Sequence, residues 1–224
     1  MKYPRIAHLP FSNVTDADDI VTSRDVFGQR WVLTEKIDGS QLSIEFDQEA
    51  IKVRNRNTVL LTGNMDAQFG PLPEWISGHL DGLWSLLGNR LIIFGEWMFH
   101  VHSIHYTCLP DLFVAFDIYD KENLDRDGRK HDGKFLPFYA AMAACASHGI
   151  KTTRVIDDAI LRDKKHLLSY IGKSAYTDGE MEGIVLHSPD GQEHYKYVTP
   201  AFKASVDAAG HWRECDRVRN SLAR

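Results

Sequence analysis

The segment Glu35-Lys36-Ile37-Asp38-Gly39-Ser40 joins two stretches with the composition of β-strands and sets a lysine, an acid and a glycine at fixed spacing between them. Residues 29–33 before it are rich in large apolar side chains, and residues 41–46 after it alternate polar and apolar side chains. Gly39 is expected to supply the turn. This pattern predicts that Lys36 lies where a strand meets a tight turn, with its amine directed into a cavity beside the sheet.

A lysine in such a position can act as a nucleophile toward a nucleotide phosphate. A free lysine, with a pKa of about 10.4, is protonated at neutral pH, so nucleophilic use requires burial or a nearby positive charge that lowers this pKa. The same residues also fit an ordinary surface lysine beside a glycine turn. The rest of the sequence decides between the two interpretations.

The length and composition favour one large domain, or one domain with a small appendage. The 224 residues are 43% hydrophobic, which allows a substantial core. The cysteines Cys108, Cys145 and Cys215 are widely spaced and odd in number, as expected for free thiols in a reducing cytosol. No apolar run approaches the roughly 20 residues of a membrane-spanning helix, and no signal-peptide core opens the chain. We therefore expect a cytoplasmic protein with no membrane partner.

The net charge of −5 argues against a protein whose whole surface binds polyanions. It remains compatible with a local groove for a nucleic-acid end, because a few basic side chains suffice to contact the phosphates there. Residues 52–57, with the sequence KVRNRN, supply such a local concentration of positive charge soon after the Lys36 segment.

The periodicity of the apolar residues predicts more strands than helices, and therefore an α+β protein. The predicted strands are residues 30–36, 40–46, 50–54, 90–98, 112–119, 151–155, 182–187 and 193–198. The predicted helices are Pro73–Leu87, Leu136–Ser147 and Asp157–Gly172. The charge-rich segment Asp120–Gly133 is expected to be an exposed hairpin or loop.

Four further segments combine an apolar strand with a residue suited to nucleotide chemistry. An acid at such a place is costly unless it is paired or faces a polar cavity, and an aromatic ring there either packs in the core or stacks on a base. The segments are 91–97 with Glu96, 112–119 with Phe116, 182–186 with Glu182, and 194–198 with Lys196.

Together with the Lys36 segment, these four form an ordered set that resembles motifs I, III, IIIa, IV and V of the covalent nucleotidyltransferase superfamily. The set reads EKIDGS, FGEW, FVAFDIYD, EGIVL and YKYV and spans residues 35–198. Within that superfamily, residues 94–98 and 102–111 resemble the ATP-dependent RNA ligases of the phage T4 RNA ligase 2 group, including stand-alone bacterial and phage enzymes. The resemblance implies an ATP-grasp-like adenylation fold, with antiparallel sheets flanked by helices.

The resemblance also implies a three-step reaction that uses ATP and Mg²⁺ or Mn²⁺. Lys36 attacks the α-phosphorus of ATP, pyrophosphate leaves, and AMP is linked to the lysine nitrogen. The AMP moves to the 5′-phosphate of an RNA, and a 3′-hydroxyl then attacks that phosphate, joins the strands and releases AMP. Lys196 is expected to hold the α-phosphate and to help lower the pKa of Lys36. Asp38 and Glu182 are expected to bind the metal.

Other roles follow from the same resemblance. Glu96 is expected to contact the ribose hydroxyls, Phe116 to stack on the adenine, and Glu35 to select adenine through its exocyclic amine. Either Arg54 or Arg56 is expected to engage the phosphates.

Two departures from the family pattern bear on these expectations. Many ligases carry a second lysine two positions after the first in motif V, but here that place is Val198, which leaves only the distant Lys203. The 28 residues after Lys196 are too few for the OB-fold of DNA ligases and capping enzymes. We therefore expect residues 1–224 to form a single adenylation domain. Residues 204–224, with Arg213, Arg217, Arg219 and Arg224, would be a short basic extension that forms a helix or extends the RNA surface.

The leading hypothesis is an enzyme that repairs broken RNA. A ligase for DNA or hybrid nicks and a non-catalytic module that binds RNA ends remain as alternatives. A zinc site at His100, His102 and His105 is disfavoured, because strand alternation places His105 on the opposite face from the other two.

Overall fold

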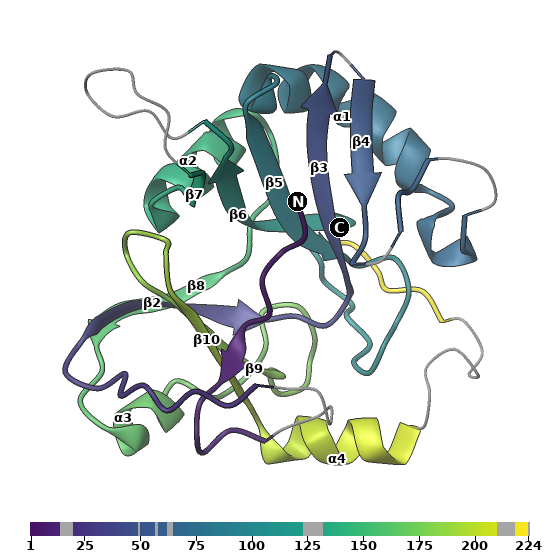
Figure 1. Ribbon diagram of the computed structural model, residues 1–224. Coiled ribbons are helices and arrows are strands. Elements are labelled where there is room, and N and C mark those ends of the chain that lie inside the picture. The colour runs from purple at the N-terminus through teal and green to yellow at the C-terminus, as the bar shows by residue number, and fades with distance from the viewer. Residues whose placement is uncertain are drawn as a thin grey trace.

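The computed structural model describes residues 1–13, 20–48, 50–56, 58–61, 65–122, 132–209 and 218–223. They form two five-stranded sheets with helices at their outer faces (Figure 1). The strands are β1 Ala7–His8, β2 Arg30–Lys36, β3 Ser40–Asp47, β4 Ala50–Arg54, β5 Leu91–Trp97, β6 Phe113–Asp120, β7 Lys134–Phe135, β8 Val155–Ile160, β9 Gly183–His187 and β10 His194–Val198. The helices are η1 Ala67–Phe69, α1 Leu72–Leu87, α2 Phe138–Ser147, α3 Lys164–Leu168 and α4 Pro200–Ala209.

The first sheet has the order β1-β10-β9-β2-β8, and the second has the order β4-β3-β5-β6-β7. Neighbouring strands are antiparallel except for the short parallel pair of β1 and β10. Because β2 lies in the first sheet and β3 in the second, residues 37–39 carry the chain from one sheet to the other. The predicted α+β class with antiparallel sheets and flanking helices is confirmed.

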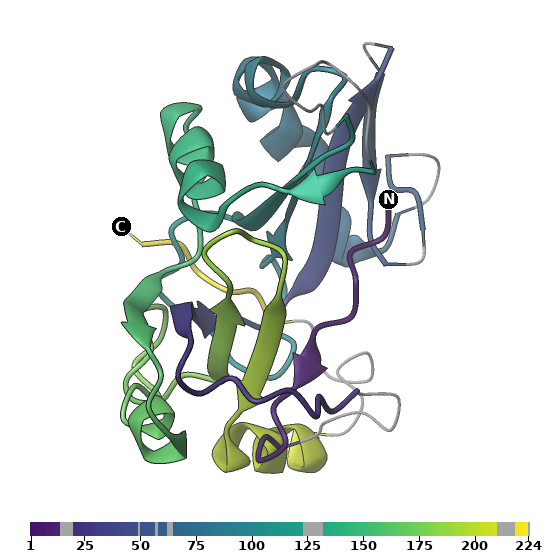
Figure 2. The ribbon, with the colours of Figure 1, turned by 60° about the vertical axis from the view of Figure 1, so that its left-hand side comes forward.

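Separate apolar cores support the two sheets. Helices α1 and α2 bury Leu83, Trp75 and Phe138 against one face of the second sheet. The amino-terminal segment runs along the other face of this sheet, where Tyr3 packs with Phe94 (Figure 2). The first sheet has its own core with the residues around α3, and α4 lies at its end. The two sheets thus approach each other beside the connection at residues 37–39.

Most of the predicted elements are present near their expected bounds, but the region after residue 150 is different. Residues 155–160 form edge strand β8 where a helix was expected, and only the short helix α3 follows. Asp163 caps α3 by accepting a hydrogen bond from the N–H of His166 at 2.8 Å, which fixes a helix start later than predicted. Of the strand expected at 151–155, Val155 is the first residue of β8, and Thr152 forms an isolated bridge with Ala115.

Further sequence predictions concerned the carboxyl-terminal region, the charge-rich segment Asp120–Gly133, the cysteines and membrane-spanning helices. Helix α4 was not among the predicted elements, and it spans the boundary expected at residue 204. The segment Asp120–Gly133 does connect a strand pair, β6 and β7, although residues 123–131 lie outside the described parts of the chain. Cys108 and Cys145 are free thiols, and Cys215 lies outside the described residues. No helix among the described residues is long and apolar enough to cross a membrane.

Residues 218–223 return to the second sheet and pair with the loop at residues 99–109. Asn220 accepts a hydrogen bond from the N–H of Tyr106 at 2.9 Å and donates two from its side chain, to the carbonyls of Met98 and His100. Because Asn220 is buried, these bonds fix the loop against the end of β5.

Candidate active site

Lys36 is the last residue of β2 and faces Glu182, which immediately precedes β9. The two strands pair so that Lys36 lies opposite Gly183. The Lys36 ammonium donates a hydrogen bond to Oε1 of Glu182 and forms an ion pair with it. The Glu182 side chain is only 1% exposed and that of Lys36 21% exposed, so the pair is largely withdrawn from water.

Three carboxylates determine the protonation of Lys36. Burial by itself lowers the pKa of Lys36, but the negative charges of Glu182, Asp38 and Glu96, with the hydrogen bond to Glu182, outweigh burial and raise this pKa. The pKa of Lys36 is therefore raised in the protein without nucleotide or metal, and the expected help of Lys196 in lowering it stays a prediction. The nearby acids dominate, and they hold Lys36 in its protonated form.

Two of these acids carry a buried oxygen with no hydrogen-bond partner among the described residues. They are Glu96 and Glu182, in each case through Oε2. Burial raises the pKa of Glu96 to about 8 and that of Glu182 to about 7, with the charge of Lys36 opposing the rise in both. Unpaired carboxylate oxygens in a confined space are suitable ligands for a hard divalent cation, which prefers oxygen donors. Glu182, which has such an oxygen, therefore fits the expected metal role, and the same role for Asp38 stays a prediction.

Beside Lys36 lies a cavity, partly open to solvent, that is lined by residues of both sheets. It brings together residues from widely separated parts of the sequence. The predicted site residues among its lining are Glu35, Lys36, Arg56, Glu96, Phe116 and Lys196. Basic side chains that can meet phosphates and an aromatic ring that can stack on a base line the same space, which suits a nucleotide. Asp38, Glu182 and Arg54 lie outside this lining.

Glu35 borders the cavity, but its carboxylate is held elsewhere. It accepts hydrogen bonds from the hydroxyl of Ser174 and from the N–H of Ala175 at 3.0 Å, and it lies 3.5 Å from Nη1 of Arg154. The expectation that Glu35 selects adenine therefore stays a prediction, and in this structure its carboxylate oxygens are held by Ser174, Ala175 and Arg154.

The two candidate arginines occupy different places. Arg56 lines the central cavity and is close enough to Glu96 to oppose the rise in its pKa. Arg54 lines a smaller hollow next to it, which it shares with Arg56. Of the two, Arg56 is the one in position to meet a ligand in the central cavity.

Two glycines permit the close contacts that shape the site. A Cβ on Gly39 would lie 2.6 Å from Sδ of Met98 and 2.7 Å from the carbonyl oxygen of Trp97. A Cβ on Gly183 would lie 2.0 Å from the carbonyl oxygen of Tyr197. Gly39 does not have a positive φ, so it is required for close approach to the end of β5 and not for an unusual turn conformation.

Sequence reasoning missed part of the cavity wall. Tyr3, Pro4 and Ile6 line it from the amino-terminal segment, and Gln41 and His187 line it from β3 and β9. The amino-terminal residues have no periodicity that would mark them. Gln41 carried a usable signal, because it lies two residues beyond Gly39 and directly opposite Glu96 in the sheet.

The structure also gives the positions of Lys203 and of the three neighbouring histidines. Lys203 lies on α4 and does not line the cavity. His100, His102 and His105 do not form a metal-ligand group within the described ranges, and the His102 ring instead lies 3.4 Å from both Ser40 Oγ and Gln68 Oε1.

Comparisons with known proteins were made on sequence and on structure. Residues 29–204 match a family model described as RNA ligase. No curated protein sequence matches the chain.

Among solved structures, Naegleria gruberi RNA ligase with pyrophosphate is similar, with a TM-score of 0.61, 24% identity, and coverage of 81% of this chain and 53% of that one. A mutant of that ligase with ATP and Mn has a TM-score of 0.60, 22% identity and the same coverage. These structures share the fold of this chain, which spans about half of their length.

Proposed function

This chain belongs to the RNA ligase family, and on that premise we propose that it is an ATP-dependent RNA ligase in which Lys36 becomes covalently linked to AMP. The observation that carries the proposal is the meeting of Lys36, Glu96, Phe116 and Lys196 at one cavity. We place it with the RNA ligases of the phage T4 RNA ligase 2 group on the motifs described above.

The first step requires Lys36 to lose its proton and its bond to Glu182. In the protein alone the acids around Lys36 raise its pKa, so its amine is not a nucleophile in that state. Asp38 and Glu182 are the residues that would hold Mg²⁺ or Mn²⁺, and the unpartnered Oε2 of Glu182 supports this role. A bound divalent cation would supply positive charge that neutralises these carboxylates and stabilises charge on the phosphate. Glu182 thus protects the nucleophile in the resting protein and releases it when the site is filled.

The remaining cavity residues orient the nucleotide. The half-buried ring of Phe116 offers a face for the adenine, and Glu96 is the acid for the ribose hydroxyls. Lys196 and Arg56 contribute positive charge toward the phosphates, where charge develops during transfer. With the nucleotide held in line, the amine of Lys36 attacks the α-phosphorus as pyrophosphate departs.

The substrate in the later steps is RNA with a 5′-phosphate and a 3′-hydroxyl, and the role is the repair of broken RNA in the cytoplasm. AMP passes from Lys36 to the 5′-phosphate, and the 3′-hydroxyl of the second end displaces it. The solved Naegleria ligase structures with ATP and Mn support the choice of cofactors. We further propose that residues 1–224 act as one adenylation domain, with residues 204–224 as a basic extension.

The test is covalent labelling with α-³²P-ATP and Mg²⁺, followed by denaturing electrophoresis. We expect a labelled band for the wild type and none for Lys36→Ala. The matched control is Lys52→Ala, which removes a lysine that pairs with Asp47 on the surface of β4 and should leave the label unchanged. Absence of label on the wild type, or its persistence in Lys36→Ala, would overturn the lysyl-AMP proposal. GTP and NAD run in parallel identify the nucleotide donor.

Two further assays separate the alternatives. Sealing of nicks that differ only in a ribose or deoxyribose at the 3′-hydroxyl end distinguishes an RNA ligase from a DNA ligase. A module that only binds RNA ends would retain 5′-phosphorylated RNA in a filter assay while forming no labelled protein.

A further inference from the structure

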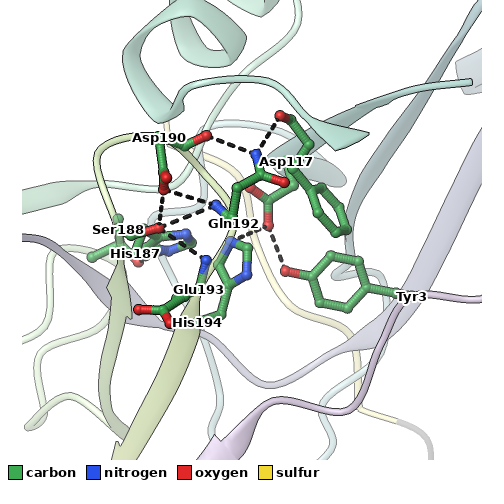
Figure 3. Close-up of polar contacts among 10 residues, drawn as sticks. Tyr3, Asp117, His187, Ser188, Asp190, Gln192, Glu193 and His194 are labelled. Carbon is green, nitrogen blue, oxygen red and sulfur yellow. Dashed lines mark hydrogen bonds and ion pairs between the residues drawn. The ribbon is translucent and has the colours of Figure 1, made fainter. Parts of the chain in front are cut away.

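Beside the nucleotide cavity, three side chains from three strands converge in the interior (Figure 3). Asp117 comes from β6 in the second sheet, and His187 and His194 come from β9 and β10 in the first sheet. One potential ligand atom from each lies within 4.8 Å of the other two. Their side chains are buried, with Asp117 1%, His187 2% and the His194 side chain 5% exposed.

Each of these side chains has a polar atom without a hydrogen-bond partner among the residues that the structure describes. The atoms are Oδ1 of Asp117, Nδ1 of His187 and Nε2 of His194. His194 Nε2 lies 3.3 Å from Oδ2 of Asp117, but not in hydrogen-bond geometry. Burying a polar atom without a hydrogen-bond partner costs free energy, because the atom loses its bonds to water. Three such atoms close together indicate that they bind a common partner.

Neighbouring side chains hold His187 and Asp117 in positions suited to binding a metal ion. Nε2 of His187 lies 3.0 Å from the hydroxyl oxygen of Thr34. When the ring donates its proton to that oxygen, the unpartnered Nδ1 keeps its lone pair, which is the form that binds a metal. The hydroxyl of Tyr3 donates to Oδ2 of Asp117 at 2.5 Å and so orients the carboxylate. Metal-binding residues are typically held by outer partners of this kind.

We propose that Asp117, His187 and His194 bind a zinc ion that joins the two sheets. Two imidazole nitrogens and one carboxylate are a frequent donor set for Zn²⁺, whereas Mg²⁺ prefers oxygen ligands throughout. The 3.3 Å between Nε2 of His194 and Oδ2 of Asp117 matches the edge of a tetrahedron with metal–ligand bonds of about 2.0 Å, so Oδ2, which the Tyr3 hydroxyl also contacts, is the oxygen of Asp117 already at this distance. The ligand atom of His187 lies within 4.8 Å of the other two and would move closer on binding the ion. A water molecule would complete the four-coordinate set.

This site is separate from the Lys36 cluster and does not depend on the proposed ligase activity. Asp117 directly follows Phe116, and the Tyr3 ring lies 5.0 Å from the Phe116 ring in an edge-on contact. A metal at Asp117 would therefore fix the wall of the cavity that carries Phe116. Its ligands are positioning residues, and loss of the metal should reduce thermal stability as well as nucleotide affinity.

The first experiment measures metal content in the full chain. Protein produced in zinc-supplemented medium and dialysed against metal-free buffer should retain close to one zinc per chain by mass spectrometry of the elements. His194→Asn and Asp117→Asn should lose most of this zinc. His105→Asn, an exposed histidine outside the cluster, and Lys36→Ala, in the separate lysine site, should keep it. Zinc loss in either control, with retention in His194→Asn, would overturn the assignment.

The second experiment uses the wild type alone, so it does not depend on variants that fold. Protein stripped with a chelator is titrated with Co²⁺, and tetrahedral coordination by nitrogen and oxygen should give intense visible d–d absorption that Zn²⁺ then abolishes. Restoring Zn²⁺ should also raise the melting temperature of the stripped protein. A wild type that retains no zinc, shows no cobalt spectrum and melts at the same temperature with and without Zn²⁺ would refute the site.

Discussion

Replacement of Glu96 by glutamine should make the protein more stable at alkaline pH. Burial raises the pKa of Glu96 from 4.5 to about 8, so the folded protein holds a proton there that the unfolded chain releases near pH 4.5. The native state therefore binds more protons between these values, and the free energy of unfolding falls as pH rises from 4.5 to 8. Glutamine is neutral at every pH and resembles the protonated acid, so the variant does not incur this loss.

The magnitude follows from the two pKa values. Their difference corresponds to an upper bound of about 5 kcal/mol for the stability lost between pH 4.5 and 8. Glu96 borders a cavity that is partly open to solvent, and the resulting high effective dielectric reduces the loss, so we expect a gain of about 1–3 kcal/mol for the variant at pH 8.5. At pH 5.5 the difference should be less than a third of this, because only about one pH unit of the window between the two pKa values has then been passed.

The assay is urea unfolding followed by tryptophan fluorescence, with EDTA present and nucleotide absent. Glu74→Gln, which removes an exposed acid from the first turn of α1, reports the effect of losing one surface charge. A stability difference between Glu96→Gln and wild type that is the same at pH 5.5 and 8.5 would refute the reasoning. So would a variant that is less stable than wild type at pH 8.5.

Four further changes test other parts of the structure. Gly39→Ala places a Cβ 2.6 Å from Sδ of Met98, so thermal denaturation should show a loss of about 1–3 kcal/mol, together with reduced adenylation. Asn220→Ala leaves the carbonyls of Met98 and His100 and the N–H of Tyr106 without their partner, which should cost about 1–3 kcal/mol in urea unfolding. Phe116→Leu should raise the KM for ATP in the labelling assay more than it lowers the rate at saturation, since the ring acts by stacking. Arg56→Ala should weaken ATP binding in calorimetry more than the same change at Arg54 does, and equal effects would contradict the placement of the two side chains.

The central strands were predictable because their side-chain pattern is simple. Residues 30–36 form β2 at the predicted bounds, and β3, β5, β6, β9 and β10 each differ from prediction by a residue or two. β8 was missed because it is an edge strand whose sequence VIDDAI has two adjacent acids that break the alternation. One of these acids, Asp158, pairs with Arg30 on β2, a partner that lies far away in the sequence.

Many residues of the candidate site were predictable from the sequence, but their arrangement was less so. The order of the motifs identified Lys36, Glu96, Phe116 and Lys196, which meet at the cavity, but also Asp38, Glu182 and Arg54, which lie outside its lining. The alternation along β2 indicated that the side chain of Glu35 points away from that of Lys36, and its carboxylate is bound by Ser174 and Ala175. Whether the pKa of Lys36 is raised or lowered depends on how close three carboxylates lie to its amine. The sequence does not give these distances. The same holds for Asp117, whose neighbours come from two other strands.

The hydrogen bond between Tyr106 and Asn220 determines the order in which parts of this protein can fold. The two residues are 114 positions apart, so the 99–109 loop leaves the ribosome long before the segment that fastens it. The hydroxyl of Tyr106 in turn accepts a hydrogen bond from the N–H of Asp38 at 3.0 Å, next to the nucleophile. A nascent chain that has completed both sheets therefore still lacks this support, and non-local closure of this kind is slow. Competence for chemistry should accordingly arise only after both sheets are complete, once residues 218–223 have been synthesised and have fastened the loop.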